Sequence, residues 1–514
     1  MIVLISMSAA VSTPLPESEQ IAELRRELHW AHPKIQVLEE RLRLQRIQKY
    51  GPASEKLGGL QLELLELEPG VSTEEVQAES EREPLADSPS TPRKRRPHPG
   101  RQSLPADLPR VERIVACPPE ECACPARGAE REVIGYDQSE QLDLEPARYF
   151  VLLTKREKRA CRCCGQGGVS AAPLPARIID KSLVSDRVVI DTLVAKYSDH
   201  LPLYRQSAIL ERETGVEISR AKLDGWVMRV GELLIPLVGA MRGELLRGNY
   251  IQADETPLEV QMHDGRGKNH QAYLWQYGRV GGGAVFDFRL GRGRDGPKQF
   301  LGRFEGILQT DAYIAYEQVG GPKMVHAGCW AHARRGFVDA LKLNRRDEAA
   351  QAVVRSIDEL FGIDAQARQQ GLDLAARQAL RQQQARPLLE RIRQQVEEAR
   401  GAALPSSALG KAARYTLALW PRLRRFLEYP ELELSNNLAE NSMRPVALGR
   451  KNWLHVGSAQ AGPKVAAIVS LVESCRRLKL PPREYLAAVL PGLAGTSVQR
   501  LPELTPAAWA SRGL

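Results

Sequence analysis

The sequence predicts a multidomain protein organised around an α/β or α+β layer domain. Its 514 residues correspond to three or four domains at about 150 residues each. After Gly248, short runs of β-favouring residues alternate with Gly- and Asp-rich turns and are followed by helical sequence, which is typical of such a layer domain. Six of the eight cysteines fall within residues 117–164, which predicts a small metal-binding module rather than a disulfide scaffold.

Composition limits the classes of protein that fit. Hydrophobic residues make up 43% and charged residues 26%, as in globular proteins. No apolar run reaches the roughly 18 residues of a membrane-spanning helix, which argues against an integral membrane protein. Residues 1–12 are apolar but lack a basic n-region and a clear cleavage site, so we expect a cytoplasmic, nucleoid-associated protein. The net charge of +9 weakly favours a polyanionic partner.

Residues 19–60 are predicted to form an N-terminal helix. Apolar residues recur from Ile21 to Leu42 at alternating spacings of three and four, and Pro33 is expected to kink or split the helix. The helix is either a short coiled coil that dimerises the chain or an amphipathic helix packed on its own domain. Residues 61–110 are rich in Glu, Ser and Pro and then basic, which predicts a flexible linker that is either solvated or loosely bound to DNA phosphates.

Residues 183–245 are predicted to be helical. Gly215 breaks the pattern, and Ser219 is a good N-cap for a following helix that opens with Arg220 and Lys222. Two helices joined by a short Gly-containing turn are typical of a helix-turn-helix DNA-binding segment. Many helical bundles share this outline, so both interpretations stay open here.

The layer domain is predicted to occupy residues 248–340 and 431–475. Its four expected strands lie in NYIQADETPLEV, QAYLWQYGRV, AVFDFRLGR and GILQTDAYIAY. Residues 341–430 form a helical, Arg-, Gln- and Ala-rich stretch between the two parts. This stretch is either an insertion that covers a ligand or an ordinary helical subdomain. Residues 476–514 form a helical tail.

Three acids are candidate ligands for a metal ion. Asp254 lies near the end of the first expected strand and Asp311 in the fourth, so both are expected to project from neighbouring strand ends into one site. Glu440 opens a later helix, with Asn436 or Asn437 as its cap. Buried carboxylates are costly unless they are paired or bound to metal, and three of them suit Mg²⁺ or Mn²⁺. The chain has 63 acids, so spacing alone does not single out these three.

Particular motifs around these acids resemble the transposases of the insertion sequence 66 family. They occur in family order from about residue 20 to about residue 490: YGPASEKL, KYSDHLPLYRQ, IQADETP, LQTDAY, AGCWAHARRGF and NNLAENSMRPVALGRKNWLHVGS. The resemblance implies a DDE recombinase with an RNase H-like core. It also implies that Asp254, Asp311 and Glu440 are the catalytic metal ligands.

Basic residues near these motifs are candidates for contact with DNA phosphates. Such contacts contribute affinity that does not depend on base sequence. For each of these residues the alternative is an ordinary surface position. Together with Arg220 and Lys222 the candidates are His332, Arg334, Arg335, Arg444, Arg450 and Lys451.

The cysteine-rich module, residues 111–175, resembles the zinc-binding segment of the family. Four thiolates in two close pairs hold Zn²⁺ tetrahedrally and organise a small domain. The first pair departs from the usual pattern because Arg127 stands where a CxxC motif would have its second cysteine. The expected ligands are Cys122, Cys124, Cys161 and Cys164, with Cys117 and Cys163 as alternatives.

The resemblance implies a transposase that binds the terminal repeats of its own element and joins them to target DNA. Both substrates are double-stranded DNA, and the protein is expected to act as a homo-oligomer, most simply a dimer, with accessory proteins encoded beside it. The alternative is a catalytically inactive DNA-binding protein, such as a decayed transposase or a repressor of the element. A metal-dependent nuclease of the same fold is a third interpretation.

Overall fold

The computed structural model describes most of the C-terminal part of the chain. The described residues are 25, 32, 34, 35, 37–40, 42, 149–154, 158–160, 169–171, 176–180, 182–262 and 267–512. The predicted linker and the four expected zinc ligands therefore lie outside the described residues, as does most of the predicted N-terminal helix. Before the layer domain, β1 (Lys158–Ala160) and β2 (Val169–Ala171) form a two-stranded antiparallel pair.

Five strands form one mixed sheet in the order β5-β4-β3-β6-β7. The antiparallel part consists of β3 (Tyr250–Val260), β4 (His270–Gly278) and β5 (Ala284–Arg289). On the other side of β3, β6 (Ile307–Gln309) and β7 (Val325–Ala327) pair in parallel. All four runs expected to form strands contribute to this sheet, and β7 is an additional strand that the sequence did not indicate.

Three helices precede the sheet, as the sequence predicted: α5 (Asp186–Tyr197), α6 (Leu203–Thr214) and α7 (Arg220–Leu246). Gly215 ends α6 in the left-handed conformation with a φ of 67°, which glycine adopts without strain. The Ser219 hydroxyl accepts a hydrogen bond from the backbone N–H of Lys222 at 3.4 Å. Both predicted helix boundaries are thus confirmed.

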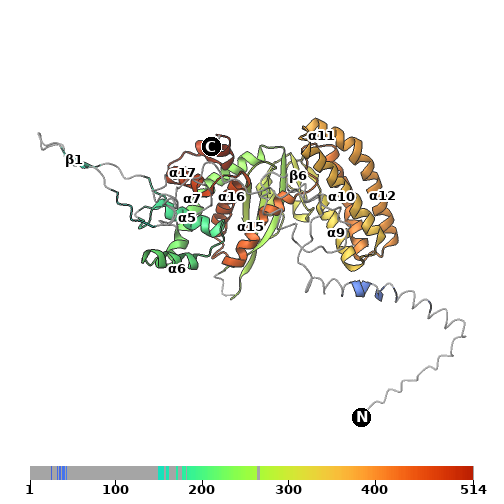
Figure 1. Cartoon of the computed structure of the whole chain (residues 1–514), viewed down its shortest axis with the longest axis horizontal. Helices are drawn as coiled ribbons and strands as arrows, with labels where there is room; N and C mark the ends of the chain where they lie inside the picture. The colour runs from blue at the N-terminus through green and yellow to red at the C-terminus, as the bar shows by residue number, and fades with distance from the viewer. Residues whose placement is uncertain are drawn as a thin grey trace, which may run out of the picture. The chain divides into compact units, whose positions relative to one another are not determined.

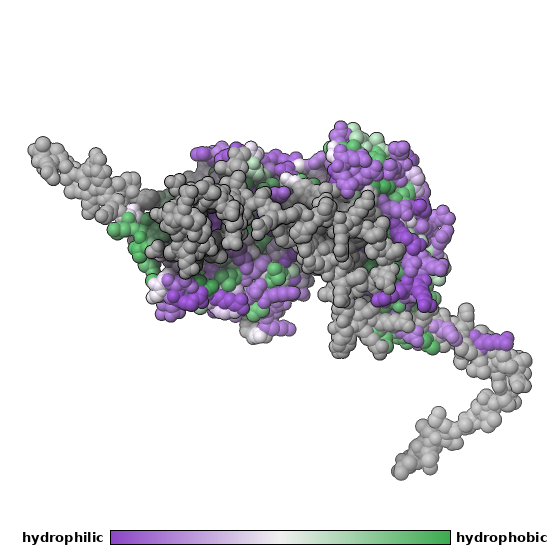
Figure 2. Space-filling view, viewed as in Figure 1, coloured by the Kyte–Doolittle hydropathy of each residue, from purple (hydrophilic) through white to green (hydrophobic). Residues whose placement is uncertain are grey.

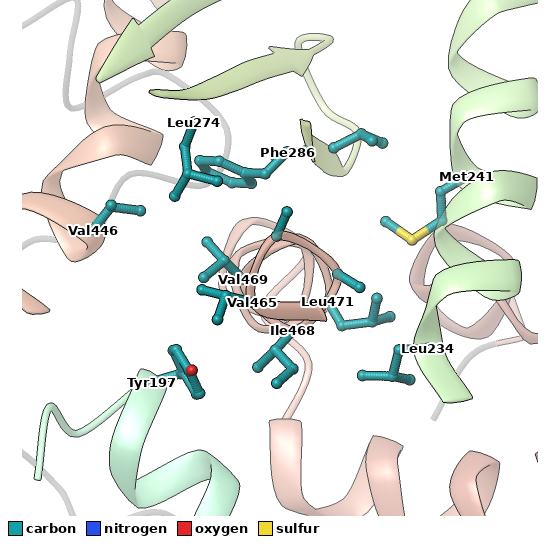
Figure 3. Packing of buried hydrophobic residues seen from close by; sticks show 14 of the residues in the cluster. Tyr197, Leu234, Met241, Leu274, Phe286, Val446, Val465, Ile468, Val469 and Leu471 are labelled. Atoms are coloured by element: carbon teal, nitrogen blue, oxygen red, sulfur yellow. The ribbon is translucent and has the colours of Figure 1, made fainter. Parts of the chain in front are cut away.

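These helices share one hydrophobic core with the sheet and with α16 (Gly462–Arg477). Figure 3 shows α16 end-on, with Ile468 directed toward the helices and Val469 toward the sheet residues Leu274 and Phe286. Leu234 of α7 approaches the same helix from the side. The predicted DNA-binding segment is therefore packed as an integral layer of the core.

A second core lies in the helical region between β7 and the final helices. In Figure 1 these helices gather beyond β6, on the side of the sheet away from α5, α7 and α16. Figure 2 shows hydrophilic residues over the outer surface of α11 and α12. The helices are α9 (Trp330–Leu343), α10 (Glu348–Gln369), α11 (Leu374–Leu380), the π-helical turn η2 (Arg381–Ala385), α12 (Arg386–Ala402), α13 (Ala408–Ala418), α14 (Trp420–Leu423) and the 3-10 turn η3 (Arg424–Leu427).

Short elements and the C-terminal helices complete the described fold. The remaining elements are α8 (Asp295–Leu301), η1 (Ile314–Tyr316), α15 (Asn437–Trp453), α17 (Pro482–Leu493), η4 (Val498–Leu504) and α18 (Pro506–Ala510). Outside the named strands, Val456 forms an isolated parallel bridge to Val260. Within the described part of the chain, no helix combines the length and the apolar character needed to cross a bilayer.

Candidate active site

Asp254 and Asp311 each follow one member of a residue pair on two neighbouring parallel strands. Gln252 of β3 is paired with Gln309 of β6, and each aspartate follows its glutamine by two residues. The expected positions were wrong in detail. Asp254 lies in the middle of β3 rather than near its end, because β3 continues along β4 to Val260.

Asp311 lies beyond the end of β6 rather than within a strand, because β6 ends at Gln309. The chain turns there, with Ala312 at a φ of 68°. The backbone N–H of Tyr313 donates to Asp311 Oδ1 at 2.8 Å, which is the local bond by which aspartate stabilises a turn. This bond also fixes the direction of the Asp311 carboxylate.

Glu440 lies in the first turn of α15, and a buried asparagine attaches this end of the helix to β3. Asn436 occupies the N-cap position, as predicted, but its side chain forms no capping bond. Its Nδ2 instead donates to the carbonyl of Ala253 at 3.4 Å. The start of α15 is thereby connected to the residue that precedes Asp254.

The electrostatics show that the three acids are neighbours. Burial raises the pKa of Asp254 to about 8, and the negative charges of Glu440, Glu255 and Asp311 contribute to the increase. The backbone N–H of Glu255, which donates to Asp254 Oδ1 at 2.9 Å, only partly offsets these effects. The described residues therefore neutralise only part of the negative charge around Asp254.

Two residues of α9 contact the Glu440 carboxylate. His332 Nε2 lies 3.6 Å from Oε1, and Arg335 Nη2 lies 3.4 Å from Oε2. Burial opposes protonation of the His332 imidazole, but Cys329 and Glu440 raise its pKa to about 9. We therefore expect a positively charged imidazole beside Glu440 at neutral pH.

The donor chemistry of the three acids fits a hard divalent cation. Carboxylate oxygens are the ligands that Mg²⁺ and Mn²⁺ prefer, and the buried Glu440 Oε1 has no hydrogen-bond partner among the described residues. In the described part of the chain, however, no three His, Cys, Asp or Glu side chains are grouped so that they hold a metal ion as they stand. The acids are thus suitable in type and electrostatically coupled, but they are not preassembled.

The structure corrects the role expected for Arg334. Its side chain is 7% exposed and forms hydrogen bonds to both carboxylate oxygens of Asp358, at 2.7 and 3.1 Å. Arg334 therefore joins α9 to α10 and is not available to DNA. The sequence placed it beside Arg335, but consecutive residues on a helix face different directions.

The other basic candidates differ in their surroundings. Arg220, Lys222 and Lys451 are exposed, and Arg444 and Arg450 are partly buried. Arg450 Nη1 donates to the carbonyl of Pro257, so this side chain is directed toward β3. A role of these residues in DNA binding stays a prediction.

The sequence reasoning missed two groups of residues around the acids. Gln252 and Gln309 are fully buried and hydrogen-bonded to each other. Each glutamine lies two residues before a candidate aspartate, inside a run of apolar residues. The repetition of this spacing in both runs was the sequence signal that could have identified them. Glu255 binds Arg292, and no local sequence signal indicates that pair.

Comparison with known protein families decides the identity of the chain. A model described as "Transposase IS66 family" matches residues 181–464, more than half of the sequence. The matched region contains the sheet, both core aspartates and Glu440. The chain belongs to the IS66 family of transposases.

Two further models match the N-terminal part of this IS66-family chain. One, described as "Transposase C of IS166 homeodomain", matches residues 37–113. The other, described as "zinc-finger binding domain of transposase IS66", matches residues 121–165. All four cysteines expected to bind zinc fall within the second match. The multidomain organisation predicted from the sequence is therefore confirmed.

Relatives of this transposase occur in Sinorhizobium fredii (strain NBRC 101917 / NGR234). Uncharacterized protein y4qI is 34% identical over 446 residues, which cover 84% of this chain and 79% of the relative. Uncharacterized protein y4jD is 33% identical over 434 residues, 80% of this chain and 83% of the relative. Uncharacterized protein y4hP is 30% identical over 500 residues, 93% of this chain and 88% of the relative.

Proposed function

We propose that this IS66-family protein is a DDE-type polynucleotidyl transferase that cuts and joins DNA at the ends of its own mobile element. The observation that carries the proposal is that Asp254 and Asp311 each lie two residues past the paired Gln252 and Gln309. Glu440 is the third acid, because Asn436 attaches the start of its helix beside Asp254. The proposed site thus draws its carboxylates from three distant segments of the chain.

The topology supports an RNase H-like core. Three antiparallel strands continue into two parallel ones, and Asp254 lies in the central strand β3 while Asp311 follows the end of the adjacent strand β6. The core is divided between residues 248–340 and 431–475, and the helical insertion, residues 341–430, separates Asp311 from Glu440. Tyr415 of this insertion donates its hydroxyl to the backbone carbonyl of Asp311 at 2.8 Å, so the insertion borders the site.

Asp254, Asp311 and Glu440 would hold Mg²⁺ or Mn²⁺. When bound, two such ions stabilise charge on the attacking and leaving oxygens of a phosphodiester displacement. The protein's own residues orient the carboxylates: the Tyr313 N–H orients Asp311, and His332 and Arg335 hold Glu440. Burial is the largest cause of the raised pKa of Asp254, and the negative charges of Glu440 and Asp311 add to it; a bound cation would offset this repulsion.

The site suits two successive displacements at phosphorus. In the first, water attacks the phosphodiester at the element's end, and the bond from phosphorus to the 3′ oxygen breaks to leave a free 3′-hydroxyl. In the second, this hydroxyl attacks a phosphodiester of the target strand and a target 3′-hydroxyl leaves. No covalent link between protein and DNA is required, since each step exchanges one P–O bond for another.

Recognition of the terminal repeats is assigned to the zinc module and to α6 and α7. Zn²⁺ would be structural, with Cys122, Cys124, Cys161 and Cys164 as its ligands. Arg220 and Lys222 are exposed at the start of α7, where they are free to approach phosphates. These contacts would place the element end relative to the three acids.

The N-terminal helix supports assembly of a dimer on DNA. Ile35, Leu38 and Leu42 are each 53% exposed, and residues 35, 38 and 42 follow the three-four spacing of a coiled-coil seam. A second copy of the helix would cover these side chains. Since the substrate is chromosomal DNA, we place the protein in the cytoplasm at the nucleoid, acting with accessory proteins encoded beside it.

The direct test is strand transfer of a labelled duplex that carries the inverted repeat flanking the gene, in the presence of Mg²⁺. We expect Asp254→Asn, Asp311→Asn and Glu440→Gln to abolish cleavage and joining. Glu259→Gln is the matched control, because Glu259 is an exposed acid of the same strand as Asp254. Activity that survives Asp254→Asn or Asp311→Asn would refute the assignment of the site.

The alternative function is DNA binding without catalysis. The observation that supports this alternative is that no preassembled metal-holding group occurs among the described residues. It predicts binding of element ends that is unchanged by EDTA, with no cleavage under any divalent metal. Equal cleavage of duplexes with and without the inverted repeat would instead indicate a general nuclease.

A further inference from the structure

Arg292 is held in a fixed position beside the acidic site. It lies in the loop between β5 and α8, and its Nε and Nη2 donate to Glu255 Oε1 at 2.9 and 2.6 Å. The Glu255 side chain is only 1% exposed, whereas that of Arg292 is 45% exposed. A buried carboxylate thus anchors a guanidinium that faces solvent.

Aromatic residues complete this anchorage. The guanidinium carbon of Arg292 lies 3.9 Å from the ring centroid of Tyr313 and 5.9 Å from that of Tyr273. The Tyr313 hydroxyl donates to the backbone carbonyl of Arg292 at 3.2 Å, and the Tyr316 hydroxyl donates to Glu255 Oε2 at 2.9 Å. These contacts restrain the Arg292 backbone, one edge of its guanidinium and one face of the guanidinium.

The anchored arginine adjoins Asp311, one of the proposed catalytic acids, through Tyr313. The ring of Tyr313 lies against the Arg292 guanidinium, and the backbone N–H of Tyr313 donates to Asp311 Oδ1 at 2.8 Å. The Arg292 Nη1 group has no hydrogen-bond partner within the described residues. One edge of the guanidinium thus remains open next to the place where the DNA is to react.

Stability does not account for this arrangement. An ion pair that buries a carboxylate, as Glu255 is buried here, is weak evidence for stability, because the cost of removing the charge from water offsets the attraction. A planar guanidinium held rigidly with a free edge is instead suited to bind a phosphate through directed hydrogen bonds. Prior fixation reduces the entropy lost on binding.

We propose that Arg292, supported by Glu255 and Tyr313, binds a backbone phosphate of the DNA next to the phosphodiester that reacts. The identity of the ligand as DNA rests on the proposed transposase function. Binding through this residue needs no metal and no base sequence, so it can be measured separately from catalysis.

The test measures binding of the full-length protein to a fluorescent duplex carrying the inverted repeat, in EDTA, over a series of NaCl concentrations. Each phosphate contact adds about 0.9 to the slope of log K against log [NaCl]. We expect Arg292→Gln to reduce the slope by about 0.9 and to weaken binding of unrelated duplexes to the same degree. Arg292→Lys keeps the charge and should retain most of the slope.

Arg393→Gln is the matched control, because Arg393 of α12 is 49% exposed and pairs with Glu397 at 3.0 Å. Its slope should equal that of the wild type. Duplexes with a single neutral methylphosphonate at successive positions then locate the contact. One position should weaken the wild type and leave Arg292→Gln unaffected.

The outcomes separate this inference from the proposed function. The assignment of Arg292 is overturned if Arg292→Gln has the same salt dependence of binding as the wild type and each methylphosphonate weakens the binding of both proteins equally. This result leaves the transposase proposal intact. A wild-type protein that binds no duplex overturns both.

Discussion

Gln252 Nε2 donates to Gln309 Oε1 at 3.1 Å, across two parallel strands in the centre of the sheet. Gln252 Nε2 also donates to the carbonyl of Ser435 at 3.0 Å, and Gln309 Nε2 donates to the carbonyl of Glu433 at 2.7 Å. These two amides thereby connect β3 and β6 to the segment that leads into α15. Asp254 and Asp311 each lie two residues after one of these glutamines, and Glu440 lies five residues after Ser435.

Replacing Gln309 tests this connection. Gln309→Leu has a similar size but leaves the carbonyls of Gly328 and Glu433 without their donor. Because unsatisfied buried polar groups cost about 1–3 kcal/mol each, we expect the free energy of unfolding to fall by about 2–4 kcal/mol. Chemical denaturation measures the change. Gln271→Leu, at an exposed position of β4, should change stability little, and equal losses in the two variants would contradict the expectation.

Stability of the metal-free protein should depend on the ionisation of Asp254. The folded state raises the pKa of this carboxyl to about 8, so the folded state binds the proton more tightly than the unfolded state. Stability is therefore lost as the pH rises from about 4 to about 8. Asp254→Asn should remove this loss and exceed the wild type in stability by a few kcal/mol at pH 9 but not at pH 4. A difference between the two proteins that does not change with pH would contradict this prediction.

Divalent metal should stabilise the wild type at the high pH at which ionisation of Asp254 destabilises it. Mg²⁺ that binds only the folded state stabilises it by mass action. At pH 9 we expect millimolar Mg²⁺ to raise the melting temperature of the wild type and to leave that of Asp254→Asn nearly unchanged. Sodium chloride at the same ionic strength controls for general screening.

Arg334 and Arg335 should behave differently although they are adjacent. Arg334→Ala leaves the partly buried Asp358 without its partner, and breaking such a pair costs about 2–4 kcal/mol. DNA affinity of the folded variant should be unchanged. Arg335→Ala removes an exposed side chain from Glu440, so it should cost less than about 1 kcal/mol and lower the rate of strand transfer. Weaker DNA binding by folded Arg334→Ala would restore the interpretation made from the sequence.

A buried ion network in the insertion should make the protein sensitive to acid. Burial opposes ionisation of Asp364, but Arg381 and Arg377 lower its pKa to about 2, and both arginines contact it at 2.7 Å. The stabilisation is present above pH 4 and is lost as the pH falls toward 2. Asp364→Asn should cost about 3–5 kcal/mol at neutral pH and should flatten this part of the pH profile. Glu397→Gln, which removes an exposed ion pair, should leave the profile unchanged.

The zinc module predicts about one zinc ion per chain, measurable by atomic emission on the full-length protein. Cys161→Ser and Cys164→Ser should each release it, whereas Cys163→Ser should retain it if Cys164 is the ligand. Less than half an equivalent in the wild type would contradict a zinc site. If Cys164→Ser retains zinc and Cys163→Ser loses it, Cys163 rather than Cys164 is the ligand.

The sequence by itself determined the family, the helical character of residues 341–430, the end of α6 and the start of α7. These features depend on local patterns: a motif, a helical period, a glycine that accepts a positive φ, and a serine that caps its own helix. The sequence also predicted Asp254, Asp311 and Glu440 as the site, although it placed both aspartates incorrectly relative to their strands.

Only the tertiary structure decided which side chains surround these acids. The pairing of Gln252 with Gln309, the burial of Arg334 against Asp358 and the anchorage of Arg292 on Glu255 join residues 24 to 57 positions apart. Such contacts depend on strand register and helix packing, which fix the direction of each side chain. A local sequence pattern does not determine the direction of a side chain.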